Sequence, residues 1–309
     1  MALFAAIGFR RALACLLAVS ASAAYAQDST PQKKDDPAQI GNRDVGKGIN
    51  FYSLEKEMAL GKQLAEEVQR QAKVVEDPLI SEYINRIGQN LVRNSDAKVP
   101  FTFRLIEGDS PNAFALPGGY VFVYTALMKI ASEEDELAAA MAHEIAHVAA
   151  RHMTRQATRS QMVNLAGVPV GVILGGGIGG AVVRQGAAAG IPAAFSHFTR
   201  QDESEADYLG VQYLYAAGYD PNGAISMFEK LESLERKQPG TVARIFSTHP
   251  MDAARIQKTE QEIGRILPGR DEYVVNTSDY IAIRQRLISL YPPKQDGRPE
   301  LRGRQDLIE

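Results

Sequence analysis

The chain has 309 residues, with 34 lysines and arginines against 37 aspartates and glutamates, and therefore a formal net charge of −3. This balance gives no support to nucleic-acid binding, because proteins that bind nucleic acids carry a strongly basic surface. Cys15 is the single cysteine, and it lies in an apolar N-terminal run. Beyond that run no disulfide can form, so the stability of the fold cannot depend on one.

The N-terminus has the pattern of a secretory signal. Arg10 and Arg11 precede an apolar run over residues 12–24, and Ala-Tyr-Ala at 24–26 forms a small-x-small cleavage site. We predict that residues 1–26 are a signal peptide, cleaved near Ala26, and that the chain is exported. Removal of this segment takes the net charge from −3 to −5, because it contains two arginines and no acidic residue.

The stretch over residues 27–50 is polar, contains no aromatic residue and includes a Lys-Lys-Asp-Asp run, which predicts a flexible linker. We expect one folded domain over residues 51–268. Residues 269–291 are expected to add a strand and a short helix, as a C-terminal extension packed on the domain. The Pro- and Arg-rich end over residues 292–309 predicts a disordered tail.

Two helices and two strands are predicted in the first part of the domain. Apolar residues recur at helical spacing from Leu54 to Val68, and Asp77 followed by Pro78 indicates the start of a second helix. Alternating apolar residues predict strands over 101–107 and 120–124. A small sheet is therefore expected before the next helix.

Residues 143–147 read His-Glu-Ile-Ala-His, within a segment from Ser132 to His152 that predicts one buried helix. Histidines four residues apart share a helix face, so His143 and His147 can bind one Zn²⁺, and Glu144 beside them can act as a general base. Such side chains are costly inside an apolar helix unless they are ligated or hydrogen-bonded. The alternative is a pair of hydrogen-bonded core histidines, which the spacing and the neighbouring glutamate disfavour.

A zinc site needs a third protein ligand, and the chain contains five histidines. His152 lies nine residues after the first histidine of the motif, which is about half a revolution around a continuous helix. We therefore expect His152 to face away from the metal, as a surface or capping residue.

A second predicted helix over residues 199–210 offers carboxylates instead. Glu203 and Asp207 are four residues apart and share a face, so Glu203 can be the third ligand and Asp207 can accept the second ring N–H of His143. Glu205 is rotated away from this face, and we expect it to be solvated. Without the upstream motif, the segment would be an ordinary charged helix face.

These residues resemble those of a known family. His143-Glu-Ile-Ala-His147 followed by Glu203-Ser-Glu-Ala-Asp207 resembles the gluzincin zinc metallopeptidases that include the CAAX prenyl protease, HtpX and the soluble periplasmic peptidases of the BepA type. Asn112–Tyr124 resembles the segment before the catalytic helix of that family, and Thr248-His249-Pro250 with Arg255 resembles its downstream motif. The resemblance covers roughly residues 50–265.

The resemblance implies a mainly helical α+β fold of the zincin type with a small sheet, and one Zn²⁺ bound by His143, His147 and Glu203. Glu144 would be the base in peptide hydrolysis. His249 and Arg255 are candidates to stabilise the oxyanion. For Arg255 the alternative is a structural ion pair. For His249 the alternative is a fourth zinc ligand in the resting enzyme, and the sequence does not decide between its two roles. We expect His249 to lie within reach of zinc in the resting state.

The two glycines before the strand at 120–124 indicate a further role for this region. An edge strand left open beside the metal can pair with an extended peptide, which makes Ala115, Leu116, Pro117, Gly118 and Gly119 the candidate substrate-binding segment. The alternative is an ordinary hairpin strand, and the resemblance favours substrate binding.

Residues 165–183 carry no charge over 19 positions, but seven of these are glycine, so a membrane helix would be poorly formed. We favour a lid near the active site, and peripheral membrane contact through this segment is the alternative.

The functional prediction is a zinc-dependent endopeptidase of the periplasm. Its partners would be polypeptide substrates such as unfolded or misassembled proteins of the bacterial cell envelope, in a quality-control role. The alternative is an envelope chaperone or assembly factor that has a zinc site and little proteolytic activity. The retained Glu144 argues against this alternative, because a structural zinc site needs no base.

Overall fold

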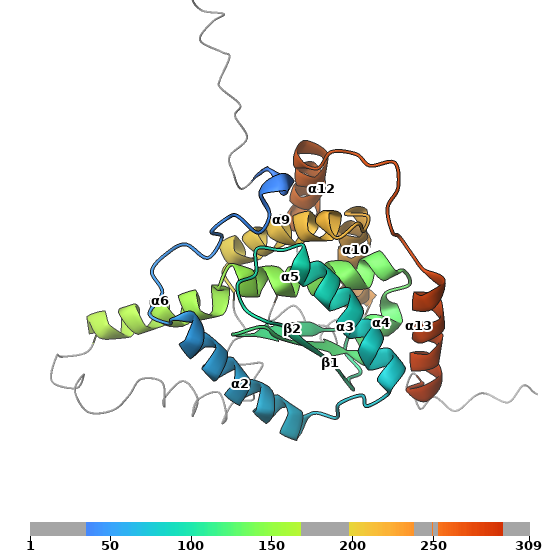
Figure 1. The fold of residues 1–309 in the computed structure, drawn as a ribbon, viewed down its shortest axis with the longest axis horizontal. Coiled ribbons are helices and arrows are strands. Elements are labelled where there is room, and N and C mark those ends of the chain that lie inside the picture. Colours follow the sequence, from blue (N-terminus) through green and yellow to red (C-terminus); the bar gives the residue numbers. More distant parts are fainter. Residues whose placement is uncertain (1–34, 168–197, 238–248, 250–252, 293–309) are drawn as a thin grey trace, which may run out of the picture. The chain divides into compact units, whose positions relative to one another are not determined.

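The computed structural model describes residues 35–167, 198–237, 249 and 253–292. The predicted signal peptide, most of the uncharged segment at 165–183 and the predicted tail from residue 293 lie outside the described residues. The described part is mainly helical and contains one small sheet, as predicted from the sequence (Figure 1).

The first elements begin where the sequence places helix-capping residues. Ser53 and Asp77 accept hydrogen bonds from the amides of Lys56 and Ile80, so each satisfies a free N–H in the first turn. In chain order the elements are η2 (Pro37–Gln39), α2 (Leu54–Gln71), α3 (Pro78–Arg93), β1 (Thr102–Ile106), β2 (Ala113–Leu116), β3 (Tyr120–Tyr124) and α4 (Thr125–Ile130).

The sheet has the order β1-β3-β2. β3 lies in the centre, parallel to β1 and antiparallel to β2, with Ala113 opposite Val123 and Leu116 opposite Tyr120. The strand that we predicted at 120–124 is therefore paired on both sides. The open edge belongs to β2, a strand that the alternation pattern did not reveal.

The remaining helices surround the long central helix α5. They are α5 (Glu134–Ala149), α6 (His152–Gly167), α9 (Arg200–Ala216), α10 (Asn222–Lys237), α12 (Ala253–Ile266) and α13 (Ser278–Leu290). α5 lies between the sheet and the helices α9 and α10 (Figure 1). A Cβ at Gly210 would lie 3.3 Å from the Cα of His143, so this glycine permits the close approach of α9 to α5.

The prediction of one helix from Ser132 to His152 is wrong at its C-terminal end. α5 ends at Ala149, Arg151 has a left-handed backbone with φ 57°, and α6 begins at His152. The side chain of Arg151 stabilises this break by donating hydrogen bonds to Glu57 Oε2 (2.8 Å) and to the carbonyl oxygen of Tyr52 (2.6 Å). The chain therefore changes direction immediately after the central motif.

Residues 37–50 do not form the flexible linker that their composition predicts. Arg43 is only 4% exposed and lies 2.5 Å from Asp96 Oδ2, and it also donates to Gln212 Oε1 at 2.6 Å. Tyr213 donates to the same carboxylate at 3.0 Å. Composition could not reveal this contact, because the partners of Arg43 lie far along the chain.

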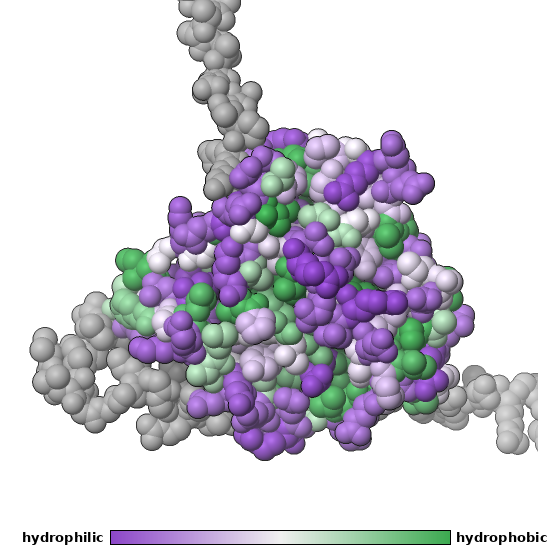
Figure 2. All heavy atoms as spheres, viewed as in Figure 1, coloured by the Kyte–Doolittle hydropathy of each residue, from purple (hydrophilic) through white to green (hydrophobic). Residues whose placement is uncertain are grey.

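The segment after α12 packs against the domain. Val274 pairs with Tyr219 in an isolated parallel bridge, and Tyr280 of α13 is fully buried and donates to the carbonyl oxygen of Ala131 at 2.8 Å. Figure 2 shows hydrophilic side chains over most of one face of the molecule, with hydrophobic residues scattered between them. None of the helices within the described residues is long and apolar enough to cross a membrane.

Candidate active site

The two histidines of α5 and one glutamate of α9 converge on one point. The Nε2 atoms of His143 and His147 are 3.0 Å apart. The Glu203 carboxylate lies beside both, with Oε2 3.5 Å from Nε2 of His143 and Oε1 3.5 Å from Nε2 of His147. Tetrahedral zinc with bonds of about 2.0–2.1 Å holds its ligand atoms about 3.3 Å apart. The spacing of these three donors therefore fits a zinc ion.

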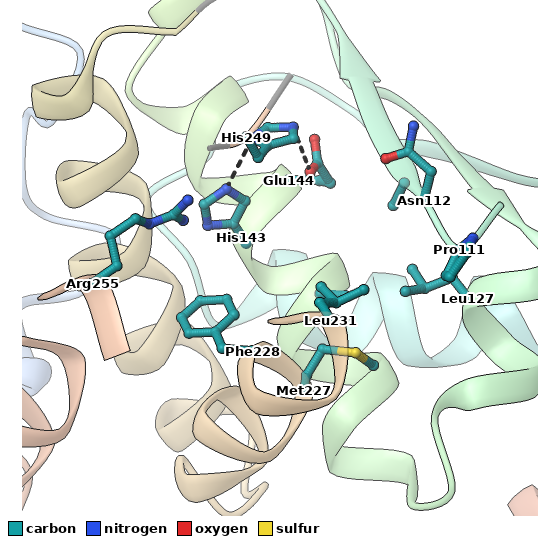
Figure 3. A pocket seen from close by; sticks show the side chains of 12 residues that line it. Pro111, Asn112, Leu127, His143, Glu144, Met227, Phe228, Leu231, His249 and Arg255 are labelled. Atoms are coloured by element: carbon teal, nitrogen blue, oxygen red, sulfur yellow. Dashed lines mark hydrogen bonds and ion pairs between the residues drawn. The ribbon is translucent and has the colours of Figure 1, made fainter. Parts of the chain in front are cut away.

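His249 brings a fourth donor to the cluster. Its Nδ1 lies 2.9 Å from Glu203 Oε1 and 3.3 Å from His143 Nε2, and the four donor atoms all lie within 4.8 Å of one another. Its other nitrogen, Nε2, lies 3.4 Å from Glu144 Oε1. Figure 3 shows the ring of His249 next to both His143 and Glu144. We predicted from the sequence that His249 lies within reach of the metal; in the structure it is one of the four residues whose donor atoms could hold an ion.

The charges of the cluster follow from burial and from its neighbours. Burial lowers the pKa of His147 well below its usual value, so this imidazole is neutral, the form that binds metals. Burial would also lower the pKa of His143, but contacts with Asp207 and Glu203 outweigh it and raise this pKa to about 10. Burial opposes ionisation of Glu203, yet the nearby histidines hold its pKa well below the usual range. Metal binding would displace the proton of His143.

Asp207 and Arg255 support the cluster from behind. Asp207 Oδ1 lies 3.0 Å from His143 Nδ1, as expected for the acceptor that orients a ligating histidine. Arg255 of α12 donates two hydrogen bonds to Asp207, at 2.7 and 2.8 Å, and its Nη1 lies 3.0 Å from Glu203 Oε2. These contacts favour the structural ion pair over the oxyanion role for Arg255.

Glu144 lies beside the cluster and touches the edge strand. It is 4% exposed, and its Oε2 accepts a hydrogen bond from the amide of Ala115 at 2.9 Å. Burial raises the pKa of Glu144, which suits a group that must take up a proton. The amide of Tyr124 donates to the carbonyl oxygen of Asn112, so these two residues form a hydrogen-bonded pair of the antiparallel ladder. Such pairs alternate along the strand, and Ala113 and Ala115 therefore occupy the non-hydrogen-bonded positions, where the backbone N–H and C=O groups point away from β3.

The five residues predicted to bind substrate divide into two groups. Ala115 and Leu116 belong to β2, whereas residues 117–119 form the turn to β3, with Gly118 and Gly119 at φ 73° and 94°. This turn packs closely on α2, because a Cβ at Gly61 would overlap the carbonyl oxygen of Pro117. Its contacts indicate a structural turn, and the open backbone lies upstream of it.

A pocket opens between Glu144 and α10. Pro111, Asn112 and Ala113, at the start of β2, line it together with several apolar side chains, and Figure 3 shows Pro111, Asn112 and Leu127 across from Glu144. The apolar lining residues are Leu127, Ala140, Met227, Phe228 and Leu231. The sequence analysis did not identify this pocket, although the apolar spacing of 227, 228 and 231 on α10 is a signal of one buried face.

His152 is not the surface residue that the sequence analysis expected. It is fully buried, and its Nδ1 lies 3.0 Å from Nδ1 of His147. The estimate of half a revolution assumed a continuous helix, and the break at Arg151 removes that assumption. Glu205, expected to be solvated, lies outside the metal cluster, but its Oε2 is 3.1 Å from Nε2 of His152.

Comparisons with known proteins agree with this geometry. The chain is 31% identical to the Beta-barrel assembly-enhancing protease of Yersinia pestis over 276 residues, which cover 86% of this chain and 55% of the relative. It is 30% identical to Metalloprotease LoiP of Escherichia coli over 201 residues, 64% of this chain and 77% of the relative. It is 32% identical to Mitochondrial metalloendopeptidase OMA1 of Schizosaccharomyces pombe over 190 residues, 58% of this chain and 52% of the relative.

The chain spans about half the length of the Beta-barrel assembly-enhancing proteases that it matches, 55% and 52% for those of Yersinia pestis and Escherichia coli. The family comparison matches residues 78–263, which include every residue of the metal cluster. This match covers more than half of the chain. The protein therefore belongs to Peptidase family M48.

Proposed function

We propose that the protein is a zinc-dependent endopeptidase that cleaves polypeptides in the bacterial cell envelope. The observation that carries this proposal is the convergence of His143, His147 and Glu203 at zinc-ligand spacing, with Glu144 beside them. The fit is chemical as well as geometric, because two imidazoles and one carboxylate are the ligands of many catalytic zinc sites.

Zinc bound there would act as a Lewis acid toward the substrate carbonyl and the attacking water. Glu144 accepts the proton that the water loses when its oxygen attacks the carbonyl carbon. When the carbon–nitrogen bond breaks, Glu144 passes the same proton to the departing amine. The hydrogen bond from Ala115 to Oε2 holds this carboxylate in place, and Oε1 faces the metal cluster, 3.4 Å from Nε2 of His249.

The open edge of β2 gives the substrate a direction. An extended peptide that pairs antiparallel with β2 runs from the Leu116 end toward the Ala113 end. Residues on the C-terminal side of the scissile bond then lie against Ala113, where the apolar pocket opens. We therefore assign to this pocket an apolar side chain that directly follows the cleaved bond.

His249 lies between the metal cluster and Glu144, where the attacking water would stand. Its Nδ1 faces the metal cluster and its Nε2 faces Glu144. This arrangement favours a resting state in which His249 is a fourth ligand and an incoming peptide displaces it. The alternative, donation of a hydrogen bond to the oxyanion, requires the ring to move away from Glu203.

The names of some relatives support a cellular role. The Beta-barrel assembly-enhancing proteases of Yersinia pestis and Escherichia coli are named for the assembly of β-barrel proteins, and we propose unfolded or misassembled envelope proteins as substrates of this chain. The Arg10-Arg11 segment and the cleavage site near Ala26 support export to the periplasm. An envelope chaperone or assembly factor with a zinc site is the second candidate.

One experiment separates the two candidates. The purified protein should contain one zinc per chain and should degrade casein, a loosely folded substrate. A chelator should stop this degradation, and added zinc should restore it. A protein that holds one zinc but leaves casein intact under all conditions would instead support the chaperone, and a protein without zinc would contradict both.

A further inference from the structure

We infer that His152 is a positioning residue for His147, and that His152 and Glu205 together determine how tightly the site holds zinc. The inference rests on the proposed zinc site, and it assigns a task to two residues outside the metal cluster. It starts from an asymmetry between the two histidines. His143 is supported directly by a carboxylate, whereas His147 is supported by another imidazole.

The contacts of His147 identify its partner. Its Nε2 is directed into the cluster, 3.0 Å from Nε2 of His143, and its Nδ1 lies 3.0 Å from Nδ1 of His152. Both His147 and His152 are 0% exposed, so each ring must satisfy its polar atoms inside the protein. The Nδ1–Nδ1 contact is therefore a hydrogen bond with one donor and one acceptor.

Metal binding decides which ring donates. When Nε2 of neutral His147 is a ligand, its only proton is on Nδ1, so His147 donates and His152 accepts. His152 must then carry its own proton on Nε2. Within the described part of the chain, the polar atoms near that nitrogen are carboxylate oxygens, Glu205 Oε2 at 3.1 Å and Asp202 Oδ1 at 3.9 Å, and an ionised carboxylate can only accept.

The hydrogen bonds thus run in one direction, from His147 to His152 to Glu205. Oε2 of Glu205, which lies 3.1 Å from Nε2 of His152, also lies 3.4 Å from Nη1 of Arg155, so this oxygen faces two N–H groups and is placed to accept. With the opposite tautomer of His152, two N–H groups would meet at 3.0 Å, and His147 could not keep its ring in the ligand orientation. Glu205 therefore acts on the metal site through His152.

The backbone is built for this contact. The left-handed Arg151 interrupts α5 and starts α6 with His152, which turns this ring back toward His147. Glu205 comes from α9, the same helix that provides Glu203 to the metal and Asp207 to His143. α9 thus orients both histidines, one directly and the other through an intermediate ring.

Zinc affinity of three His152 variants tests the inference. In His152→Asn the amide oxygen can stand where Nδ1 stands and accept from His147. In His152→Gln the amide lies one carbon farther along, and in His152→Leu there is no acceptor. We expect the Gln and Leu variants to bind zinc about 10–100-fold more weakly, and the Asn variant to stay within about threefold of the wild type. Competition with a fluorescent chelator measures these constants on purified metal-free protein.

Glu205→Leu should weaken zinc binding by less, about threefold to tenfold, because His152 can still accept in one of its tautomers. The double variant with His152→Leu should bind no more weakly than His152→Leu alone, since the two residues act in series. Thr158→Val is the matched control. This residue is also fully buried in α6 and accepts from the amide of Phe51 at 3.0 Å, so its loss should lower the melting temperature and leave zinc affinity unchanged.

The outcomes separate two failures. If the wild type binds no zinc and cleaves no casein, the proposed function is wrong. If the wild type binds zinc and the Leu and Gln variants bind it equally well, or if the Asn variant loses as much as the Gln variant, His152 does not position His147. Circular dichroism shows whether each variant is folded. If His152→Leu does not fold, the difference in zinc affinity between His152→Asn and His152→Gln still tests the inference.

Discussion

Two carboxylates of α5, Glu144 and Asp135, are buried in opposite ways. In the second half of the helix, Glu144 is buried but accepts a hydrogen bond from Ala115, and the neighbouring His143 lies 3.0 Å from Asp207. In the first turn, Asp135 is 3% exposed, and its Oδ1 has no hydrogen-bond partner among the described residues. Burial, together with Glu133 and Glu136, raises the pKa of Asp135 to about 7.

The difference shows that burial of a carboxylate does not by itself indicate a functional site. Both carboxylates have raised pKa values because both are desolvated. Only Glu144 lies within reach of a metal cluster, an open strand edge and a pocket. At Glu144 the hydrogen bond from Ala115 fixes the orientation of the buried carboxylate, whereas Oδ1 of Asp135 has no such partner among the described residues.

The largest effect on zinc content and activity is expected from substitution of Glu203, the metal ligand on α9. Glu203→Ala removes the only carboxylate of the cluster, and we expect complete loss of bound zinc and of casein cleavage. Metal analysis after gel filtration checks this. Glu205→Ala should remain partly loaded under the same conditions, because Glu205 touches His152 and not the cluster. A loaded Glu203 variant beside an empty Glu205 variant would mean that the wrong carboxylate has been chosen.

Glu144→Gln tests the partnered carboxylate. The amide keeps the shape of the side chain but cannot accept a proton, so zinc content should be normal while cleavage falls by about 10²–10⁴-fold. Initial rates of casein digestion by zinc-loaded protein measure the loss. Near-normal turnover would remove Glu144 from the role of base.

His249→Ala differs from these variants in the sign of its effect. If His249 blocks the fourth position, its removal should raise basal cleavage without emptying the site. A fall of about 10²–10³-fold would instead identify a hydrogen-bond donor to the oxyanion. Unchanged activity would leave His249 without a catalytic role.

Asp135→Asn tests the other end of α5 and should have the smallest effect, on stability alone. The native pKa of about 7 lies above the unfolded value, so the native state keeps a proton that the unfolded state releases. The free energy of unfolding therefore falls as the pH rises from about 4 to about 7. The Asn variant should be about 1–3 kcal/mol more stable than the wild type at pH 8 and equally stable near pH 4.

Urea unfolding at the two pH values measures the difference. Asp271→Asn is the control, because Asp271 is exposed and its substitution removes the same charge at the surface. If both variants are stabilised equally at pH 8, the gain comes from net charge and not from relief of the buried carboxyl.

Local patterns predicted the helices well because their signals lie within a few residues. Asp77 with Pro78 gave the start of α3, and the four-residue spacing of Glu203 and Asp207 gave the shared face of α9. The same reasoning failed at His152. The left-handed backbone of Arg151 ends the regular helix, so the direction of the His152 side chain no longer follows from about 3.6 residues per turn. Arginine has no intrinsic preference for that conformation, so the sequence carried no local signal for it.

Contacts between distant segments were the second source of error. The edge position of β2 depends on how β1 and β3 pair in parallel, which no hydrophobic alternation specifies. The pocket needs Met227 and Phe228 of α10 to face Ala113, more than a hundred residues earlier. Contacts between residues so far apart in the sequence can be predicted only when the topology of the fold is known.

The anchoring of Arg43 sets a limit on how this protein can be shortened. The family match begins at residue 78, yet the guanidinium of Arg43 neutralises Asp96 in the interior, on the far side of that boundary. A fragment trimmed to the matched range would leave Asp96 buried without its cation, a loss of the order of 3–5 kcal/mol that is comparable to the whole stability of many domains. The range of sequence similarity is therefore shorter than the folded domain, and we expect a stable fragment to include Arg43.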